Sequence, residues 1–184
     1  NPYLKPSSAD SWNFGLRYEP SWLAGLTVDA GLLEIELEDA PVTVGFQTIL
    51  NLCAASLRYC QFIQRGPAGQ IYGNDLFNVA VNELQASTQS ADFSLQYQRG
   101  ALTLDWQGVY LMRSSLTVPR ASRNGVEVDL IETNYVGTNQ GNFALPRWKS
   151  NLGLTWASNH WDASWRMRYI HHQRERCNEQ SFGA

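Results

Sequence analysis

The fold of this chain is indicated by the stretch Trp161–Tyr169, which reads Trp-Asp-Ala-Ser-Trp-Arg-Met-Arg-Tyr. Every odd position carries an apolar side chain, and every even position carries a polar or charged one. Because successive side chains of a β-strand point to opposite faces, the stretch predicts a strand with one apolar and one polar face. A soluble sandwich would bury the apolar face, whereas a membrane barrel would turn it to lipid and the polar face to a watery lumen.

The same two-residue alternation recurs along the chain and predicts further strands. In one of them Val109 and Leu111 fall on the polar face, but the apolar side of that strand is otherwise continuous. The alternating stretches are Ser11–Glu19, Asp92–Gln98, Leu102–Met112 and Trp148–Trp156.

One more strand is expected over Leu26–Asp39, where the alternation changes phase near Gly31–Leu33. A β-bulge would absorb such a slip, because one extra residue re-aims every side chain beyond it. After the slip, Glu34, Glu36 and Glu38 share the polar face. These carboxylates suggest either a cation site or, as we favour, lumen-facing charge opposite arginines of other strands.

The connections between these strands alternate between short and long. Outer-membrane barrels show this pattern, with short periplasmic turns and long extracellular loops, whereas long structureless loops are uncommon in compact soluble domains. The sequence therefore favours an all-β fold: an antiparallel transmembrane β-barrel segment of about six strands, with residues 1–184 in one domain. The connections, in order, are Pro20–Gly25, Ala40 to about Gln89, Arg99–Ala101, Ser114–Arg147 and Ser158–His160.

In this interpretation the side chains at alternate positions of each strand face lipid, and those at the positions between them face the lumen. A sugar-stacking platform is the alternative use of the aromatic side chains, but lipid contact is favoured because the other parity is free to face the lumen. The side chains expected to face lipid are Trp12, Phe14, Leu16, Tyr18, Phe93, Leu95, Tyr97, Leu104, Trp106, Trp156, Trp161, Trp165, Met167 and Tyr169. Those expected to face the lumen are Arg17, Glu34, Glu36, Asp105, Lys149, Arg166 and Arg168.

Composition and motifs argue against an enzyme or a nucleic-acid-binding protein. The sequence has no nucleophile elbow, zinc-protease motif, phosphate loop or dinucleotide fingerprint, so we expect no catalytic residues and no cofactor. Its 14 Lys and Arg against 17 Asp and Glu leave no basic surplus for phosphates. His171 and His172 are adjacent on a strand and point to opposite faces, so a solvated strand end is a better interpretation than a metal site.

Three motifs resemble TonB-dependent outer-membrane receptors, and the resemblance spans nearly the whole chain. Asn1–Pro6 with Ser11–Pro20 is similar to their NPxLKPE and LGLxYEP stretch, Glu34–Ala40 to their IEIEDAI strand end, and Ala144–Leu152 to their LPRWRSNL segment. The chain departs from the family at Ser7 and Pro41, and Ala30-Gly31-Leu32 replaces an aromatic stretch.

The resemblance implies active uptake through the outer membrane of a Gram-negative bacterium. Such receptors also carry an N-terminal plug with a TonB-contacting segment and a closing aromatic strand. We find neither in this sequence, and therefore expect a fragment of the barrel that is inactive alone. The implied partners are outer-membrane lipid, the TonB complex through the missing plug, and an extracellular small-molecule ligand such as an iron chelate, a vitamin or an oligosaccharide. Ala40–Ala86 and Ser114–Ala144 are expected to contact that ligand.

The chain has three cysteines, two of them close together. Cys53 and Cys60 lie in the first long loop, and outside the cell such a pair can persist as a disulfide. Free or metal-binding thiols are the alternative, although no histidine or acidic cluster accompanies them. Cys177 is left over and is expected to pair with a cysteine beyond this sequence.

Two other functions stay open at this point. A passive porin would show the same strands without a plug or TonB. A soluble β-sandwich or adhesin module would bury the aromatic face against protein and remain in solution without detergent.

Overall fold

The computed structural model describes residues 4–71, 78–121, 128–140 and 143–175, so Cys177 lies outside the described residues. The chain forms mostly strands, with a short helical segment after the second one. In chain order the elements are β1 (Ser8–Tyr18), β2 (Leu26–Val44), α1 (Phe46–Ser56), the 3-10 helix η1 (Cys60–Phe62), β3 (Val79–Arg99), β4 (Leu102–Ala121), β5 (Val128–Asn134), β6 (Thr138–Gln140), β7 (Phe143–Leu145), β8 (Trp148–Ala157), β9 (Asp162–Ile170) and β10 (Arg174–Glu175).

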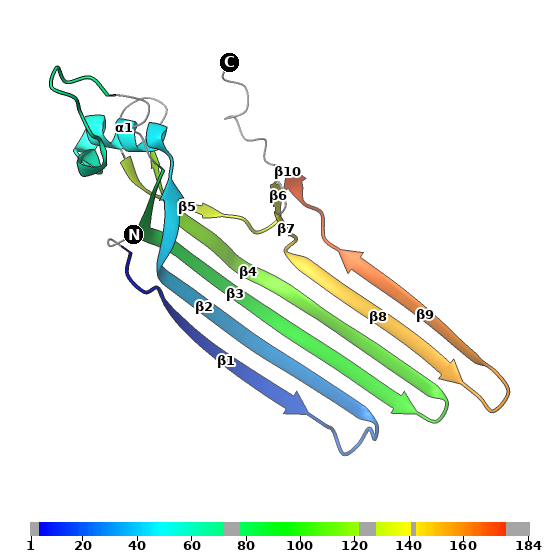
Figure 1. Ribbon diagram of the computed structural model, residues 1–184. Helices are drawn as coiled ribbons and strands as arrows, with labels where there is room; N and C mark the ends of the chain where they lie inside the picture. The colour runs from blue at the N-terminus through cyan, green and yellow to red at the C-terminus, as the bar shows by residue number, and fades with distance from the viewer. Residues whose placement is uncertain (1–3, 72–77, 122–127, 141–142, 176–184) are drawn as a thin grey trace. The chain divides into compact units, whose positions relative to one another are not determined.

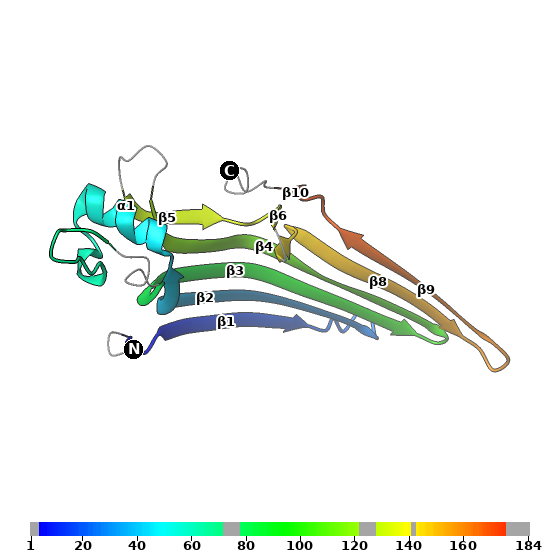
Figure 2. The ribbon, with the colours of Figure 1, turned by 45° about the horizontal axis from the view of Figure 1, so that its top comes forward.

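The principal sheet has the strand order β1-β2-β3-β4-β8-β9, with β5 paired to β4, and both views show these strands following one another in chain order (Figure 1, Figure 2). A smaller sheet has the order β10-β6-β7, in which β10 runs parallel to β6. The six strands predicted from the alternation are therefore all present, and the antiparallel β fold is confirmed.

Three strands extend well beyond the stretches that the alternation predicts. β2 ends at Val44, β3 begins at Val79 and β4 continues to Ala121, so the first long connection is shorter than expected. It also contains α1 and η1, and the second long connection contains β5, β6 and β7. The end of β2 and the start of β3 contribute Val44 and Val79 to the apolar cluster around α1, so these strand ends depend on contacts with a helix that the local pattern does not reveal.

The register of β4, β8 and β9 fixes which side chains share a face. Trp106 pairs with Leu152, which pairs with Met167, and Leu154 pairs with Trp165. The opposite face carries Asp105, Lys149, Arg166 and Arg168, since Asp105 pairs with Gly153, which pairs with Arg166, and Asn151 pairs with Arg168. The side chains thus separate into an apolar and a polar face as the alternation predicts.

The bulge expected near Gly31–Leu33 is absent from β2. Asp29 bonds to Ser94, a Cβ added to Gly31 would meet Asp92, and Glu34 bonds to Gln89. Each step forward along β2 thus matches an equal step back along β3, so the register does not change. Glu34 therefore lies on the other face of the sheet from Asp29 and Arg17. This corrects the expectation that Glu34 shares the polar face with Arg17. Glu36, two residues further on, lies on the same face as Glu34.

A different irregularity does occur in β2. Asp39 has φ of 52°, which places a non-glycine residue in the left-handed region. Its carbonyl oxygen accepts a hydrogen bond from the side-chain amide of Asn82 in β3. At Gly31–Leu33, therefore, the wet side chains change from one face of the strand to the other without an irregularity of the backbone. The backbone departs from regular β geometry only further along the strand.

The chain divides into two compact units, and among the described residues only the first has a buried apolar core. That core consists of Val44, Ile49, Leu52 and Tyr59, with Leu52 fully buried. Unit 1 comprises Asn1–Asp10, Glu36–Ala86 and Ser115–Thr133, and unit 2 comprises Ser11–Ile35, Ser87–Ser114 and Asn134–Ala184.

Candidate functional site

The apolar face of unit 2 is exposed. Phe14 is 62% and Trp165 is 54% accessible, although a globular protein would bury such side chains first. No residue of unit 2 belongs to the buried apolar core among the described residues. An exposed apolar face of this extent marks a surface that contacts something other than water. Its other exposed members include Trp12, Leu16, Tyr18, Trp106, Leu154, Trp156, Met167 and Tyr169.

Aromatic rings on this face pack against one another. The Phe93 ring contacts Trp106 edge to face at 4.6 Å between centroids and stacks on Trp148 at 5.3 Å. Gly108 makes room for it, because an added Cβ would come within 2.6 Å of the Phe93 ring. Trp148 is absent from our set of predicted lipid-facing residues, although its parity on β8 could have identified it.

The polar face carries a hydrogen-bonded charge pair. Arg17 Nε lies 2.7 Å from Asp29 Oδ1, and Ser94 Oγ donates to Asp29 Oδ2 at 3.0 Å. These three residues come from β1, β2 and β3, so the network crosses the sheet. Asp29 and Ser94 were not predicted as site residues, although both alternate with apolar neighbours in the sequence.

Two adjacent hollows lie on the polar face further along the sheet. The larger has a volume of about 740 Å³, and its lining includes Thr27, Gln96, Asp105 and Arg166. The second is lined by Asn151 and Arg168 as well as by Asp105 and Arg166. Carboxylate, guanidinium and amide groups therefore line one continuous wet surface, which suits a polar solute or a polar protein segment.

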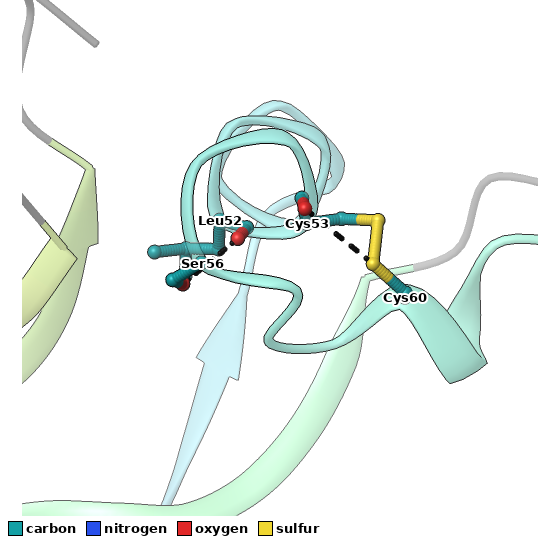
Figure 3. The surroundings of a disulfide bond; sticks show 4 residues. All are labelled: Leu52, Cys53, Ser56 and Cys60. Carbon is teal, nitrogen blue, oxygen red and sulfur yellow. Dashed lines mark hydrogen bonds between the residues drawn. A yellow bond between two sulfur atoms is a disulfide. The ribbon is translucent and has the colours of Figure 1, made fainter. Parts of the chain in front are cut away.

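A disulfide closes the helical segment of unit 1 (Figure 3). Cys53, in α1, is bonded to Cys60, the first residue of η1. Cys60 Sγ also lies 3.5 Å from the carbonyl oxygen of Cys53, and Ser56 Oγ donates to the Leu52 carbonyl at 3.0 Å. Between the cysteines, Leu57 and Tyr59 have φ of 60° and 64°, so the turn holds two non-glycine residues in left-handed geometry.

The same segment is tied to β3 through Glu83. Arg58 Nη2 lies 2.6 Å from Glu83 Oε2, and the Tyr59 hydroxyl donates to the same oxygen. Burial, and then the hydrogen bond and charge of Glu83, raise the pKa of Tyr59 well above its ordinary value. Tyr59 therefore stays a neutral donor, and the segment is held by a buried ring, an ion pair and a disulfide.

Comparison with known protein families identifies this architecture. The family model described as TonB dependent receptor-like, beta-barrel, matches residues 1–181. The chain belongs to this receptor family. No curated protein matches the chain. Members of the family lie in the outer membrane of Gram-negative bacteria and carry out TonB-coupled transport; they are transporters, not enzymes.

The family is one of β-barrels that cross a membrane. A barrel of this kind turns the apolar side of its strands to lipid, whereas a sandwich buries that side against protein. In the described residues no helix is long and apolar enough to cross a membrane. No group of three or more His, Cys, Asp or Glu suited to a metal ion occurs in the same ranges.

The structure also places the paired histidines. His171 and His172 follow the end of β9, and their ring centroids are 4.1 Å apart. The Tyr169 hydroxyl lies 3.1 Å from His171 Nδ1. The strand-end position is the one we favoured from the sequence. Because backbone alternation ends with the strand, the two rings come close together instead of pointing to opposite faces.

Proposed function

We propose that residues 1–184 are part of one barrel domain of a receptor that takes up a scarce ligand, such as an iron chelate, a vitamin or an oligosaccharide. The observation that carries the proposal is the receptor-family match over residues 1–181. The exposed aromatic face and the separate polar face of the sheet support it. TonB supplies the energy, and we propose that it acts through a plug domain inside the barrel.

We further propose that the apolar face contacts membrane lipid and the polar face lines the lumen. β8 and β9 have 10 and 9 residues, which is about the 9–11 residues that a tilted strand needs to cross a bilayer. Arg17, Asp105, Lys149, Arg166 and Arg168 would then be lumen-facing. The residues predicted to face lipid from the sequence keep that role in this proposal.

The long connections between strands are the proposed ligand-contacting segments on the extracellular side. In the first, Leu57 is 80% accessible on the segment closed by the disulfide. A large apolar side chain held on a rigid segment is suited to contact a ligand, because little conformational freedom is lost on binding. The turn between β1 and β2 carries another exposed side chain, Trp22, which we place on the periplasmic side.

Deletion of the gene in its native strain tests the transport proposal. Uptake of radiolabelled iron chelates, vitamins and oligosaccharides is measured in the parent, in the deletion strain, and in a strain lacking TonB. We expect uptake of one ligand class to be lost in both mutants and to be restored in the deletion strain by the full-length gene. Receptor-dependent uptake that persists without TonB would instead indicate a passive porin.

A loop variant tests the proposed ligand contact. Leu57→Ser in the full-length receptor should weaken binding of the ligand identified by the uptake assay, while Trp22→Ser at the opposite connection should not. Both variants should retain the heat-modifiable mobility of a folded barrel. Equal binding by the two variants would remove Leu57 from the ligand contact.

A further inference from the structure

Basic side chains gather at the outer ends of β8 and β9. A hollow of about 470 Å³ lies there, lined by the side chains of Arg147, His171, His172, Arg174 and Glu175 and by the segment around Gly137. The two arginines come from separate parts of the chain. The Arg174 backbone N–H bonds to the Gly137 carbonyl at 2.9 Å, which fixes this end of the hollow.

The hollow has an excess of positive charge and hydrogen-bond donors. Glu175 is its one carboxylate against two guanidinium groups. Neither Arg147 nor Arg174 forms an ion pair among the described residues. Unpaired guanidinium forks suit the geometry of phosphate oxygens.

The hollow adjoins the apolar face of the sheet. Arg147 lies over the Tyr110 ring at 6.0 Å from the centroid, and its Nη1 is 3.4 Å from the Tyr110 hydroxyl. The His171 backbone N–H bonds to the Trp148 carbonyl at 2.9 Å. Tyr110, Trp148 and the histidine-bonded Tyr169 all belong to the aromatic side of the sheet.

The length of the strands indicates the depth of this site in the membrane. Since β8 and β9 are each about one hydrocarbon thickness long, residues just beyond their ends reach the headgroup region. Tyr and Trp collect at that boundary, and basic residues beside it recognise anionic headgroups. The basic hollow thus lies one step outside the aromatic belt, at the end connected by the long loop.

We propose that this hollow is a phosphate-binding site at the outer membrane surface, with the phosphate supplied by an outer-leaflet lipid headgroup or by a soluble phosphorylated compound. Arg147 and Arg174 bind the phosphate oxygens, and the histidines supply further N–H donors. The assignment of this site to the membrane surface rests on the proposed orientation of the barrel. The positive charge of the hollow does not depend on that orientation.

Binding by the full-length receptor in detergent tests the site. The probes are lipid A with both phosphates, the same lipid without phosphates, and soluble glucosamine 1-phosphate. The double variant Arg147→Gln/Arg174→Gln should bind lipid A about tenfold more weakly, and Arg174→Gln alone should show a smaller loss. Arg99→Gln, at the opposite end of the sheet, removes one charge as Arg174→Gln does, and should bind as the parent does.

Each outcome of this experiment decides the proposal. Loss in the double variant for lipid A alone identifies a lipid site, and the same loss for glucosamine 1-phosphate alone identifies a soluble source. Unchanged binding in a folded double variant, equal binding of the phosphate-free lipid, or no binding of either phosphate probe would overturn the site. The failure of uptake through the barrel would leave these results unaffected, so the two proposals can be distinguished.

Discussion

At the scale of single residues, neighbouring side chains in one strand meet different surroundings. Trp165 and Ser164 follow each other in β9, yet Trp165 pairs with Leu154 on the apolar face and Ser164 pairs with Thr155 on the polar face. Both side chains are exposed in the described structure. In the proposed orientation Trp165 faces lipid and Ser164 faces the lumen, so the solvent of each face, rather than burial, should decide the effect of substitution.

Trp165→Arg should cost about 2–4 kcal/mol of barrel stability if the residue lies near the bilayer midplane, because a guanidinium group is placed in hydrocarbon. Ser164→Arg puts the same group on the proposed lumen face and should cost far less. Folding titrations of the full-length receptor in lipid measure both values. Equal penalties would mean that the two faces have been assigned to the wrong solvents.

Gly25 is a residue whose replacement should disturb a turn. Its φ is +89°, and an added Cβ would lie 2.1 Å from the Gln98 carbonyl oxygen. Gly25→Ala should therefore destabilise the barrel by more than about 1 kcal/mol. Gly100→Ala is the matched control, because Gly100 has φ of +57° but nothing within 4 Å of the new Cβ. A smaller loss at Gly25 than at Gly100 in the same titrations would contradict the close approach.

At the scale of elements, α1 and η1 form a closed helical segment inside a long connection. Ile49 and Leu52 are three residues apart on α1 and are both buried, which is the spacing of a helix face. That spacing could have predicted α1 from the sequence. Cys53 and Cys60 then join α1 to η1, and Glu83 holds the intervening turn.

The disulfide between Cys53 and Cys60 should be present in receptor isolated from outer membranes. Chain-entropy arguments give such a small ring about 2–3 kcal/mol of stabilisation, from which any strain in the loop is subtracted. Mass spectrometry of non-reduced peptides should recover the two cysteines in one linked species. Their recovery as free thiols, with reduced and alkylated receptor as the control, would remove the disulfide.

At the scale of the whole molecule, β1 and β9 are the two edge strands of the principal sheet in the described part of the chain. Each edge presents backbone N–H and C=O groups that hydrocarbon cannot satisfy, at several kcal/mol per group. Further strands on both edges would satisfy them, as in a closed barrel.

Expression of these 184 residues alone, with an export signal, should therefore yield aggregates or irregular oligomers and no transport. Heat-modifiable gel mobility and ligand uptake, in a strain that lacks the parent receptor, check this expectation against the full-length protein. A discrete monomeric barrel with TonB-dependent uptake would contradict it.

The strands of unit 2 and the grouping of their side chains could be predicted from the sequence. A strand repeats every two residues, so Trp161–Tyr169 shows its two faces without reference to any other segment. The short turns followed from the same local pattern. The family resemblance, carried by motifs such as Ala144–Leu152, agreed with the family match.

Only the tertiary structure decided the strand register, the full length of β2, β3 and β4, and the pairing of β10 with β6. The end of β2 and the start of β3 pack on the apolar cluster around α1, and pairing between distant segments leaves no periodic trace in either one. For the same reason the sequence could not pair Glu34 with Gln89 or bring Arg147 to the hollow beside Arg174. Those contacts depend on which strands become neighbours, and that depends on the whole sheet.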